Sequence, residues 1–288
     1  MQANWKEKLI FLAPAIIYLL FFSVFPLIYS INVSLTDFNI SRQNTGYFIG
    51  LKNFIHLLSS GSLFIKSMLN TLKIIIIAIP VELCLGYTIA HMFYTVRKKK
   101  YISALRTIYL IPIMMTPLVF GLTWSYILNP LLGIMNYLLV LIKLEPLPWF
   151  GSYNMAIYTI IGVDVWQWTP FVAMLILIGL LGIPQEVIEA AEVDGVKLYQ
   201  KVISIEIPMI KKVLVIAVIM RLMDLFRMFD IIYATTKGGP GGSTDVISMF
   251  AYREAFSYCN IGVGSAASII ALILTVLLST FFNKYSRR

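Results

Sequence analysis

Apolar residues fall into six long blocks that are separated by shorter, more polar segments. The blocks cover residues 9–31, 69–93, 105–128, 155–181, 213–233 and 261–282. A helix of ~20 apolar residues crosses the ~30 Å hydrocarbon core of a bilayer. The pattern therefore predicts an all-α, polytopic membrane protein with six transmembrane helices in a single domain over residues 1–288.

The first block follows Lys6 and Lys8, as the apolar core of a signal peptide follows basic residues. It is longer than the ~7–15 apolar residues of such a core, and no A-x-A cleavage pattern comes after it. We expect it to be a retained span.

Composition supports a membrane protein and excludes several other classes. Apolar residues make up 59% of the chain and charged residues 13%, against roughly 45–50% and 25% in soluble domains. So little charge could not cover the surface of a soluble domain. The same composition excludes a disordered chain and a nucleic-acid-binding domain. The two cysteines, Cys84 and Cys259, form no metal or redox pattern.

The distribution of the net charge of +9 predicts the topology. With the N-terminus inside, basic residues of the inner segments outnumber those of the outer segments two to one, mainly because of the run at 97–100. The inner set is Lys6, Lys8, Arg97, Lys98, Lys99, Lys100, Arg106, Lys197, Lys201, Lys211, Lys212, Lys284, Arg287 and Arg288. The outer set is Arg42, Lys52, Lys66, Lys73, Lys143, Lys237 and Arg253. Since cytoplasmic loops carry the excess of Lys and Arg, both termini are expected in the cytoplasm.

One inner loop, at residues 183–212, differs from the other connections. It reads as a short helix that begins at Pro184, a break at Gly195 and a second short helix that Pro208 stops. Its first helix carries several carboxylates, so it cannot lie in lipid. An ordinary amphipathic loop would explain this much; a surface for a soluble partner is the alternative.

The spacing within this loop resembles a known motif. Glu189-Ala190-Ala191 is followed by Gly195 and then by Ile205-x-Ile207-Pro208. The pattern resembles the cytoplasmic "EAA" loop of ABC-importer permeases, which usually has Leu in place of Ile207. The resemblance implies a coupling helix that docks in a groove of an ATPase. It implies coupling roles for Glu189, Ala190, Ala191, Asp194, Gly195 and Pro208, with Val187, Ala190 and Ala191 as the buried side of the contact.

Further motifs resemble one branch of that family. Phe229-Asp230, the glycine-rich stretch at 238–244 and the segment at 252–256 are similar to the larger, maltose-type permease of carbohydrate uptake. The glycine-rich stretch is not a nucleotide site, because Gly242 stands where a phosphate-binding loop needs Lys before its hydroxyl residue.

The resemblance also implies partners and a location. The chain would bind no cofactor, and ATP and Mg²⁺ would be held by two cytoplasmic ATPase subunits. A second, non-identical permease would complete a heterodimer, and an external solute-binding protein would deliver the sugar. The chain would lie among lipids of a bacterial inner or plasma membrane and would bind no nucleic acid.

Ionisable residues inside apolar blocks cost roughly 2.5–3.5 kcal/mol each on insertion scales, so each needs a reason. Glu82 lies in the second block and Asp164 in the fourth, and His91 near the inner end of the second is expected at the interface. In the fifth block Arg221, Asp224, Arg227 and Asp230 alternate in sign at intervals of three. Neighbours at i,i+3 meet on a helix, so the four could form a self-paired ladder, a polar wall on a water-filled path, or both.

The resemblance places the substrate path against the third, fourth and fifth spans. The corresponding positions are Thr116, Pro117, Gln167, Trp168, Phe171, Arg221, Asp224, Leu225 and Met228. Trp168 and Phe171 offer faces for a pyranose, and the polar members offer hydrogen bonds. Arg221 would suit an acidic sugar, whereas its neutralisation by Asp224 would suit a neutral oligosaccharide; both stay open.

Two functions of other classes compete with a transport subunit. A polytopic glycosyltransferase-type enzyme would need convergent catalytic groups, but the chain has only His56 and His91 and no H-E-x-x-H. An ion-coupled secondary transporter would be supported by inverted repeats, and none is evident. Either alternative leaves the loop at 183–212 unexplained.

Overall fold

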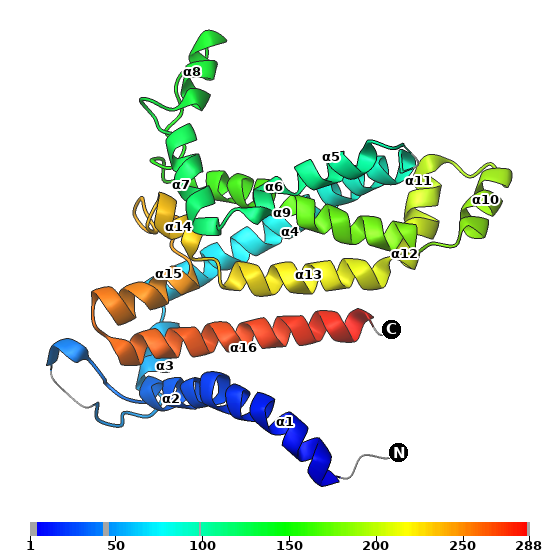
Figure 1. Ribbon diagram of the computed structural model, residues 1–288. Helices are drawn as coiled ribbons and strands as arrows, with labels where there is room; N and C mark the ends of the chain where they lie inside the picture. Colours follow the sequence, from blue (N-terminus) through cyan, green and yellow to red (C-terminus); the bar gives the residue numbers. More distant parts are fainter. Residues whose placement is uncertain (1–4, 43–45, 98, 287–288) are drawn as a thin grey trace. The chain divides into compact units, whose positions relative to one another are not determined.

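The computed structural model describes residues 5–42, 46–97 and 99–286. Every regular element in these ranges is a helix (Figure 1). Within the same ranges, one isolated antiparallel β-bridge joins Thr36 and Phe48. Three basic residues used for the topology, Lys98, Arg287 and Arg288, lie outside the described residues.

Four helical stretches are long and apolar enough to cross a membrane: Phe11–Ser34, Leu63–Thr95, Ala156–Leu181 and Ile261–Lys284. The first is built from α1 (Trp5–Leu19), the π-helical turn η1 (Leu20–Val24) and α2 (Phe25–Ser34). The other three correspond to α4 (Leu63–Thr95), α9 (Ala156–Leu181) and α16 (Ile261–Ser286). The expectation of an all-α protein with several spans is confirmed.

The third apolar block is not one helix. It is divided into α5 (Ile102–Tyr109), α6 (Ile111–Met114) and α7 (Pro117–Ile127). Thr116 is extended, with ψ 140°, because the ring of a proline disfavours helical geometry in the residue before it. Pro117 then starts α7, where its missing N–H costs nothing.

The fifth block is broken as well. α13 (Lys211–Phe226) ends before residues 227–229, and α14 (Asp230–Thr235) follows. The C-terminal helices of the two broken blocks, α7 and α14, pack closely, since a Cβ added at Gly121 of α7 would lie 3.0 Å from the Cβ of Ala234 in α14. Helix length alone therefore identifies four spans, and the third and fifth blocks are each made of shorter helices.

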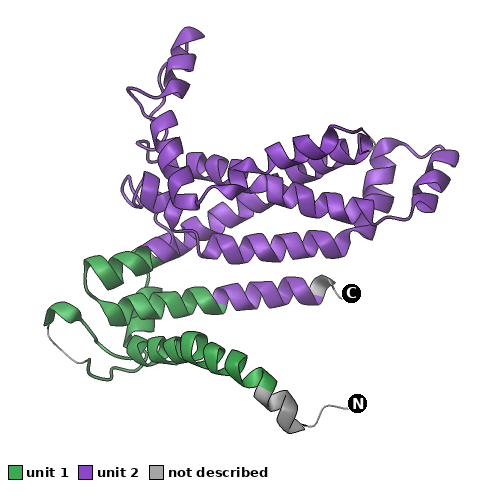
Figure 2. Cartoon of the chain, viewed as in Figure 1, with its two compact units in different colours: residues 1–65, 250–273 green, residues 66–249, 274–288 purple. Residues whose placement is uncertain are grey.

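The chain forms two compact units (Figure 2). Unit 1 comprises residues 1–65 and 250–273 and includes η2 (Ile40–Arg42), α3 (Lys52–Leu58) and η4 (Arg253–Ser257). Asn53 of α3 is buried and its amide donates to the carbonyls of Ser34 and Thr36, at 2.9 and 2.8 Å. These carbonyls lie at the end of α2, where helices leave acceptors unpaired.

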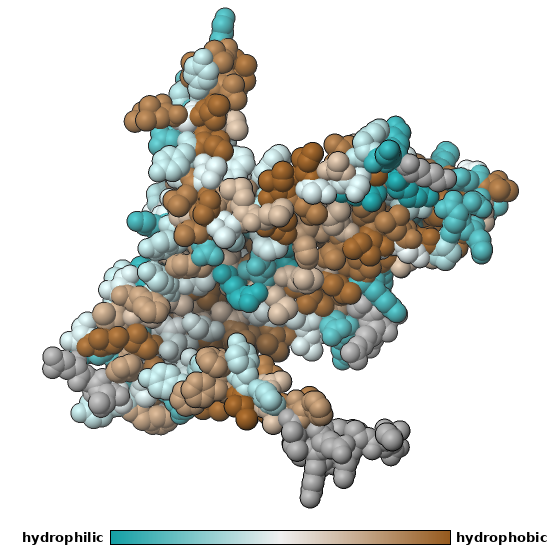
Figure 3. Space-filling view, viewed as in Figure 1, coloured by the Kyte–Doolittle hydropathy of each residue, from teal (hydrophilic) through white to brown (hydrophobic). Residues whose placement is uncertain are grey.

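Unit 2 comprises residues 66–249 and 274–288, with α8 (Ile134–Leu141), α10 (Gln185–Val193), α11 (Leu198–Gln200), η3 (Lys201–Glu206) and α12 (Ile207–Met209); α15 (Ile247–Tyr252) begins in it. α9 packs against α13 and α6. One apolar core joins α4 and α9 to the segment around α10, and its members are Ala90, Tyr94, Val172, Ile176, Leu177, Leu180, Ile183, Ile188 and Ile210. Apolar residues are also frequent on the visible surface, and polar residues gather around α10 (Figure 3).

Candidate functional site

A buried guanidinium in unit 2 holds three carboxylates. Arg221 is 1% exposed, and its Nε and Nη2 donate to the two oxygens of Glu82, at 2.6 and 2.8 Å. Nη2 also donates to Asp164 Oδ2 at 2.6 Å, and Nη1 donates to Asp224 Oδ2 at 2.7 Å. We call these four residues the Arg221 cluster.

Three helices contribute to the Arg221 cluster. Arg221 and Asp224 share a face of α13 because they are three residues apart. Glu82 comes from α4 and Asp164 from α9, and Trp168, one turn after Asp164, places its ring 4.6 Å from the Arg221 guanidinium. The fork of the guanidinium matches the carboxylate of Glu82 bidentately, so the cluster fixes these helices to one another.

The predicted ladder is present in its first half only. The Arg221–Asp224 ion pair is present at 2.7 Å. α13 ends at Phe226, so Arg227 lies past the helical register and donates to the carbonyl of Met223 at 3.3 Å. Among the described residues no ion pair of Arg227 or Asp230 is found. The i,i+3 pattern was therefore wrong for this second half, because the helix that it assumed stops.

A small cavity of about 50 Å³ lies beside the Arg221 cluster, between the breaks of the third and fifth blocks. Its lining residues are Pro117, Asp164, Trp168, Asp224, Arg227, Met228, Phe229, Asp230 and Ile231. Interrupted helices that meet at membrane depth form the binding sites of many transporters. Because Arg221 has three carboxylates around it, the cluster presents acceptor oxygens to this cavity rather than a free cation.

Gln167 supports the first break from α9. It is 1% exposed, and its Nε2 donates to the carbonyl of Met115 at 3.1 Å. Irregular backbone inside a bilayer needs such a partner, since no lipid group can hydrogen-bond to it. The other amide atom, Oε1, is buried without a partner among the described residues.

The structure brings together only part of the path expected from the sequence. Pro117, Trp168, Asp224 and Met228 line the cavity, and Arg221 lies behind it. Phe171 makes an edge contact with Trp168, at 6.0 Å between ring centroids, but packs against the apolar core. Leu225 is buried and Thr116 is exposed at the break.

Sequence reasoning missed Glu82 and Asp164 as members of this site. Both were recognised as polar residues inside spans, but neither was assigned to Arg221. The charges offered a signal: the second and fourth blocks each hold one acid without a basic residue near it in sequence at the same depth, and the fifth block holds two arginines, Arg221 and Arg227. Phe229 and Ile231, which line the cavity next to the start of α14, could be assigned to it only after the break was known.

The loop at 183–212 contains the expected helix, α10, which Pro184 precedes as an N-cap with extended geometry. Gly195 has φ +68°, and a Cβ there would meet no atom within 4 Å. The backbone therefore turns at a conformation that favours glycine. The side chains of Glu189, Ala190 and Asp194 are exposed.

Two expectations for this loop need correction. Ala191 is buried within its own chain, as is Ile188, which belongs to the apolar core of unit 2; at i,i+3 they form one face that packs inward. Pro208 does not stop a helix but lies inside α12, directly after the π-helical turn η3. A proline is tolerated at the first positions of a helical segment because the N–H it lacks would be unpaired there.

The same turn buries a carboxylate. Glu206, the last residue of η3, is 0% exposed. The hydroxyl of Tyr87 donates to its Oε2, and Nδ1 of His91 lies 3.4 Å from the same oxygen. Tyr87 and His91 are four residues apart on α4, so they share one face of that helix.

The glycine-rich segment is a closed turn structure. The ammonium of Lys66 donates to the carbonyl of Gly241 at 2.6 Å, and the amide of Asn70 donates to the carbonyls of Gly242 and Asp245, at 3.1 and 2.9 Å. The Ser67 hydroxyl donates to Asp245 Oδ2 at 3.0 Å. These side chains all come from the first turns of the unit 2 part of α4, so the segment is bound to that helix.

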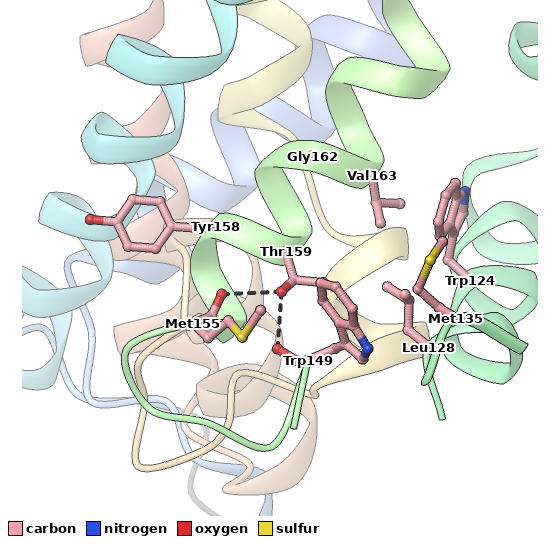
Figure 4. Close-up of a pocket in the computed structure, with 9 residues that line it drawn as sticks. All are labelled: Trp124, Leu128, Met135, Trp149, Met155, Tyr158, Thr159, Gly162 and Val163. Carbon is pink, nitrogen blue, oxygen red and sulfur yellow. Dashed lines mark hydrogen bonds between the residues drawn. The ribbon is translucent and has the colours of Figure 1, made fainter. Parts of the chain in front are cut away.

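A larger, apolar pocket of about 310 Å³ lies elsewhere in unit 2 (Figure 4). Its lining residues are Trp124, Leu128, Met135, Trp149, Met155, Tyr158, Thr159, Gly162 and Val163. The Thr159 hydroxyl at this pocket is already engaged, since it lies within hydrogen-bond distance of the carbonyls of Trp149 and Met155, at 3.0 and 3.2 Å. None of the predicted path residues lines this pocket.

The chain belongs to the family of binding-protein-dependent transport system inner membrane components, whose model matches residues 82–288. It is therefore a multi-pass permease subunit of an ABC importer and not an enzyme; ATP hydrolysis is carried by separate subunits. Membership implies ATPase and solute-binding-protein partners.

Similar proteins and one solved structure also belong to ABC transporters. The chain is 36% identical over 243 residues to the trehalose/maltose transport system permease protein MalF of Thermococcus litoralis, covering 83% of this chain and 80% of that protein. It is 32% identical to the probable ABC transporter permease protein YurN of Bacillus subtilis, covering 96% and 94%. A crystal structure of a bacterial ABC transporter involved in the import of the acidic polysaccharide alginate has the same fold, with a TM-score of 0.80, 24% identity and coverage of 96% and 94%.

Proposed function

We propose that this permease imports a neutral, hydroxyl-rich carbohydrate. The name of the trehalose/maltose relative supports a sugar as the class of substrate. The observation that supports a neutral substrate is the Arg221 cluster: Nε and both Nη atoms of the buried Arg221 guanidinium donate to carboxylates of the same chain. An arginine engaged in this way has little capacity for a carboxylate or phosphate of the substrate.

The proposed path comprises the residues expected from the sequence, namely Thr116, Gln167, Trp168, Phe171, Arg221, Asp224, Leu225 and Met228. Asp224 of this path would accept hydrogen bonds from sugar hydroxyls together with Asp164, which lines the same cavity. The ring of Trp168 would face the C–H side of a pyranose. Gln167 Oε1, which is buried without a partner in the described structure, would become an acceptor for a donor on the sugar. Arg221 would orient the carboxylates rather than touch the sugar.

An acidic sugar is the second candidate, and one residue favours it. Arg227 lines the same cavity and is exposed, so its guanidinium could face an anionic group. Asp164, Asp224 and Asp230 line that cavity too, which is the reason for preferring the neutral substrate.

Uptake into proteoliposomes tests both candidates. The complete importer would be offered radiolabelled trehalose or maltose in one arm and short alginate oligosaccharides in the other. Uptake of a neutral disaccharide that Arg227→Gln does not reduce supports the proposal. Uptake of the acidic sugar alone, abolished by Arg227→Gln, would replace it with the second candidate. ATP-driven uptake of neither class would contradict the carbohydrate assignment.

The topology proposed for residues 1–288 is a single permease domain that crosses the membrane six times with both termini in the cytoplasm. The interrupted helices of the third and fifth blocks would each complete one crossing. In a variant whose native Cys84 and Cys259 are replaced by Ser, a cysteine at position 192, on the exposed side of α10, should react with an impermeant maleimide only after the cells are opened. Labelling of position 192 in intact cells would contradict the proposed orientation.

The loop at 183–212 is proposed to receive movement from one of two ATPases, with a second, non-identical permease contacting the other. Glu189, Ala190 and Asp194 would meet the ATPase, since these side chains are exposed, whereas Ala191 and Pro208 would hold the loop to its own chain. Gly195→Trp should abolish uptake and leave the protein in the membrane. Gly195→Asn is the matched control, because Asn tolerates a positive φ; normal transport by Gly195→Trp would contradict the coupling role.

A further inference from the structure

Glu206 is a buried carboxylate that the transport path does not use. It stands at the end of η3, between the coupling helix α10 and the long helix α13 that carries Arg221. Any displacement of α10 that reaches Arg221 along the chain has to pass this residue. Its position alone makes it a candidate for transmitting the movement.

The contacts of Glu206 join this segment to a different helix. Tyr87 donates its hydroxyl to Oε2, and the His91 imidazole faces the same oxygen at 3.4 Å. Both residues belong to α4, which also carries Glu82 of the Arg221 cluster. α4 therefore holds the α12–α13 region at two separate points, one near each end of α13.

The two attachments differ in how completely they are satisfied. Glu82 has a donor on each oxygen. Glu206 has both neighbours on Oε2, while Oε1 is buried without a partner among the described residues, and His91 Nδ1 lacks a hydrogen bond of normal geometry there. A buried acceptor without a donor destabilises the arrangement that contains it, so the attachment at Glu206 is the easier one to release.

The local backbone is suited to a change of register. η3 is a π-helical turn of six residues, Lys201–Glu206. Such turns are rare and occur frequently at functional sites of helices. A turn that reverts to α-helical geometry rotates and shifts the residues that follow it, and here the first of these are α12 and α13.

We propose that Glu206 is a positioning residue of energy coupling, and that its bond to Tyr87 is a latch. The closed latch keeps the segment after the coupling helix against α4, and the movement of the coupling helix opens it. This inference rests on the coupling role proposed above for the loop at 183–212. It adds that α4 sets the threshold for the movement.

ATP hydrolysis by the purified complete importer tests the latch without knowledge of the sugar. The rate with MgATP would be measured with and without the solute-binding protein. Tyr87→Phe and Glu206→Ala should each raise the basal rate, and so lower the stimulation ratio, by about three- to tenfold, the equilibrium effect of one lost hydrogen bond. Glu206→Gln keeps an acceptor for Tyr87 and should retain most of the ratio. Tyr126→Phe, whose side chain is 77% exposed on α7, is the matched control and should behave as the parent.

The double variant Tyr87→Phe/Glu206→Ala distinguishes a shared contact from two independent ones. A single latch predicts that the double variant is no worse than either single variant. Unchanged ratios in both single variants, or losses that multiply in the double variant, would overturn the proposal. A parent complex that the binding protein does not stimulate would instead contradict the coupling role of the loop.

Hydrogen exchange of the unmodified complex tests the latch without variants, and so it remains available if a variant complex fails to assemble. Amides of residues 201–206 should exchange faster after a non-hydrolysable ATP analogue and Mg²⁺ are added, while amides of the buried part of α9 stay unchanged. Equal exchange at 201–206 in both conditions would overturn the latch.

Discussion

Two buried carboxylate sites tie α4 to the segment from η3 to α13, and they are built differently. At the Arg221 cluster a guanidinium gives four hydrogen bonds to three acids, and both oxygens of Glu82 are bound. At the loop end, Glu206 is bound through one oxygen only. The first site is suited to a fixed reference point beside the cavity, and the second to a contact that opens and closes.

The contrast also explains how a buried charge is tolerated. Glu82, Asp164 and Arg221 are each 1% exposed or less, and such groups persist at depth only when they are paired and hydrogen-bonded. Glu206 is equally buried, but a tyrosine hydroxyl and a histidine replace the arginine. The difference predicts that the two sites respond unequally to the same kind of substitution.

Removal of Arg221 should have the largest effect. Arg221→Gln leaves three acids without their common partner, and breaking a buried pair in this way costs about 3–5 kcal/mol of the free energy of unfolding. Chemical unfolding in detergent micelles, monitored by tryptophan fluorescence, measures it. Adding Glu82→Gln should restore part of the loss. If Arg221→Gln were as stable as the parent, the Arg221 cluster would not be a fixed reference point.

Asp224→Asn tests the exposed edge of the same cluster. The Asp224 side chain is 36% exposed, and Arg221 keeps its bonds to Glu82 and Asp164, so the protein should fold. If Asp224 accepts a hydroxyl of the sugar, the KM for uptake should rise about tenfold, which corresponds to one lost hydrogen bond to a charged group. Equal KM and maximal rate in parent and variant, at equal expression, would make Asp224 purely structural.

Glu206→Gln should change stability far less than Arg221→Gln. The amide oxygen still accepts from Tyr87, and the NH2 group replaces an oxygen that had no partner among the described residues, so the free energy of unfolding should stay within about 1 kcal/mol of the parent. The same detergent unfolding experiment gives the comparison directly. A loss as large as that of Arg221→Gln would mean that the two sites are equally rigid.

The smallest effect is expected at the surface of the loop. Glu192 and Lys201 form an ion pair at 3.1 Å, and the Glu192 side chain is 65% exposed. The Lys201 side chain is 16% exposed, but the pair reaches solvent through Glu192, so we expect it to contribute about 0.2–1 kcal/mol and salt to weaken it. Glu192→Gln and Lys201→Gln should therefore lower stability slightly and equally at low salt, and not at all at high salt; a larger loss would give this pair a part in holding η3.

The sequence by itself determined the class of protein and the position of its loop. Apolar blocks of more than ~20 residues permit little besides membrane helices, and the spacing from Glu189 to Pro208 identified the family. Composition and periodicity act locally, so they predicted α4, α9 and α16 well. The exposed polar face of α10 followed from its acids, which cannot enter lipid.

Tertiary structure decided what the charged residues do. The i,i+3 rule found the Arg221–Asp224 pair but extended it to Asp230, because it could not see that α13 stops at Phe226. Glu82 and Asp164 lie 139 and 57 positions from Arg221 in the sequence, and no local sequence pattern predicts contacts at such separations. The inward packing of Ala191 and the burial of Glu206 likewise depend on α4 and α9, since only the packed neighbours determine which face of a short helix is covered.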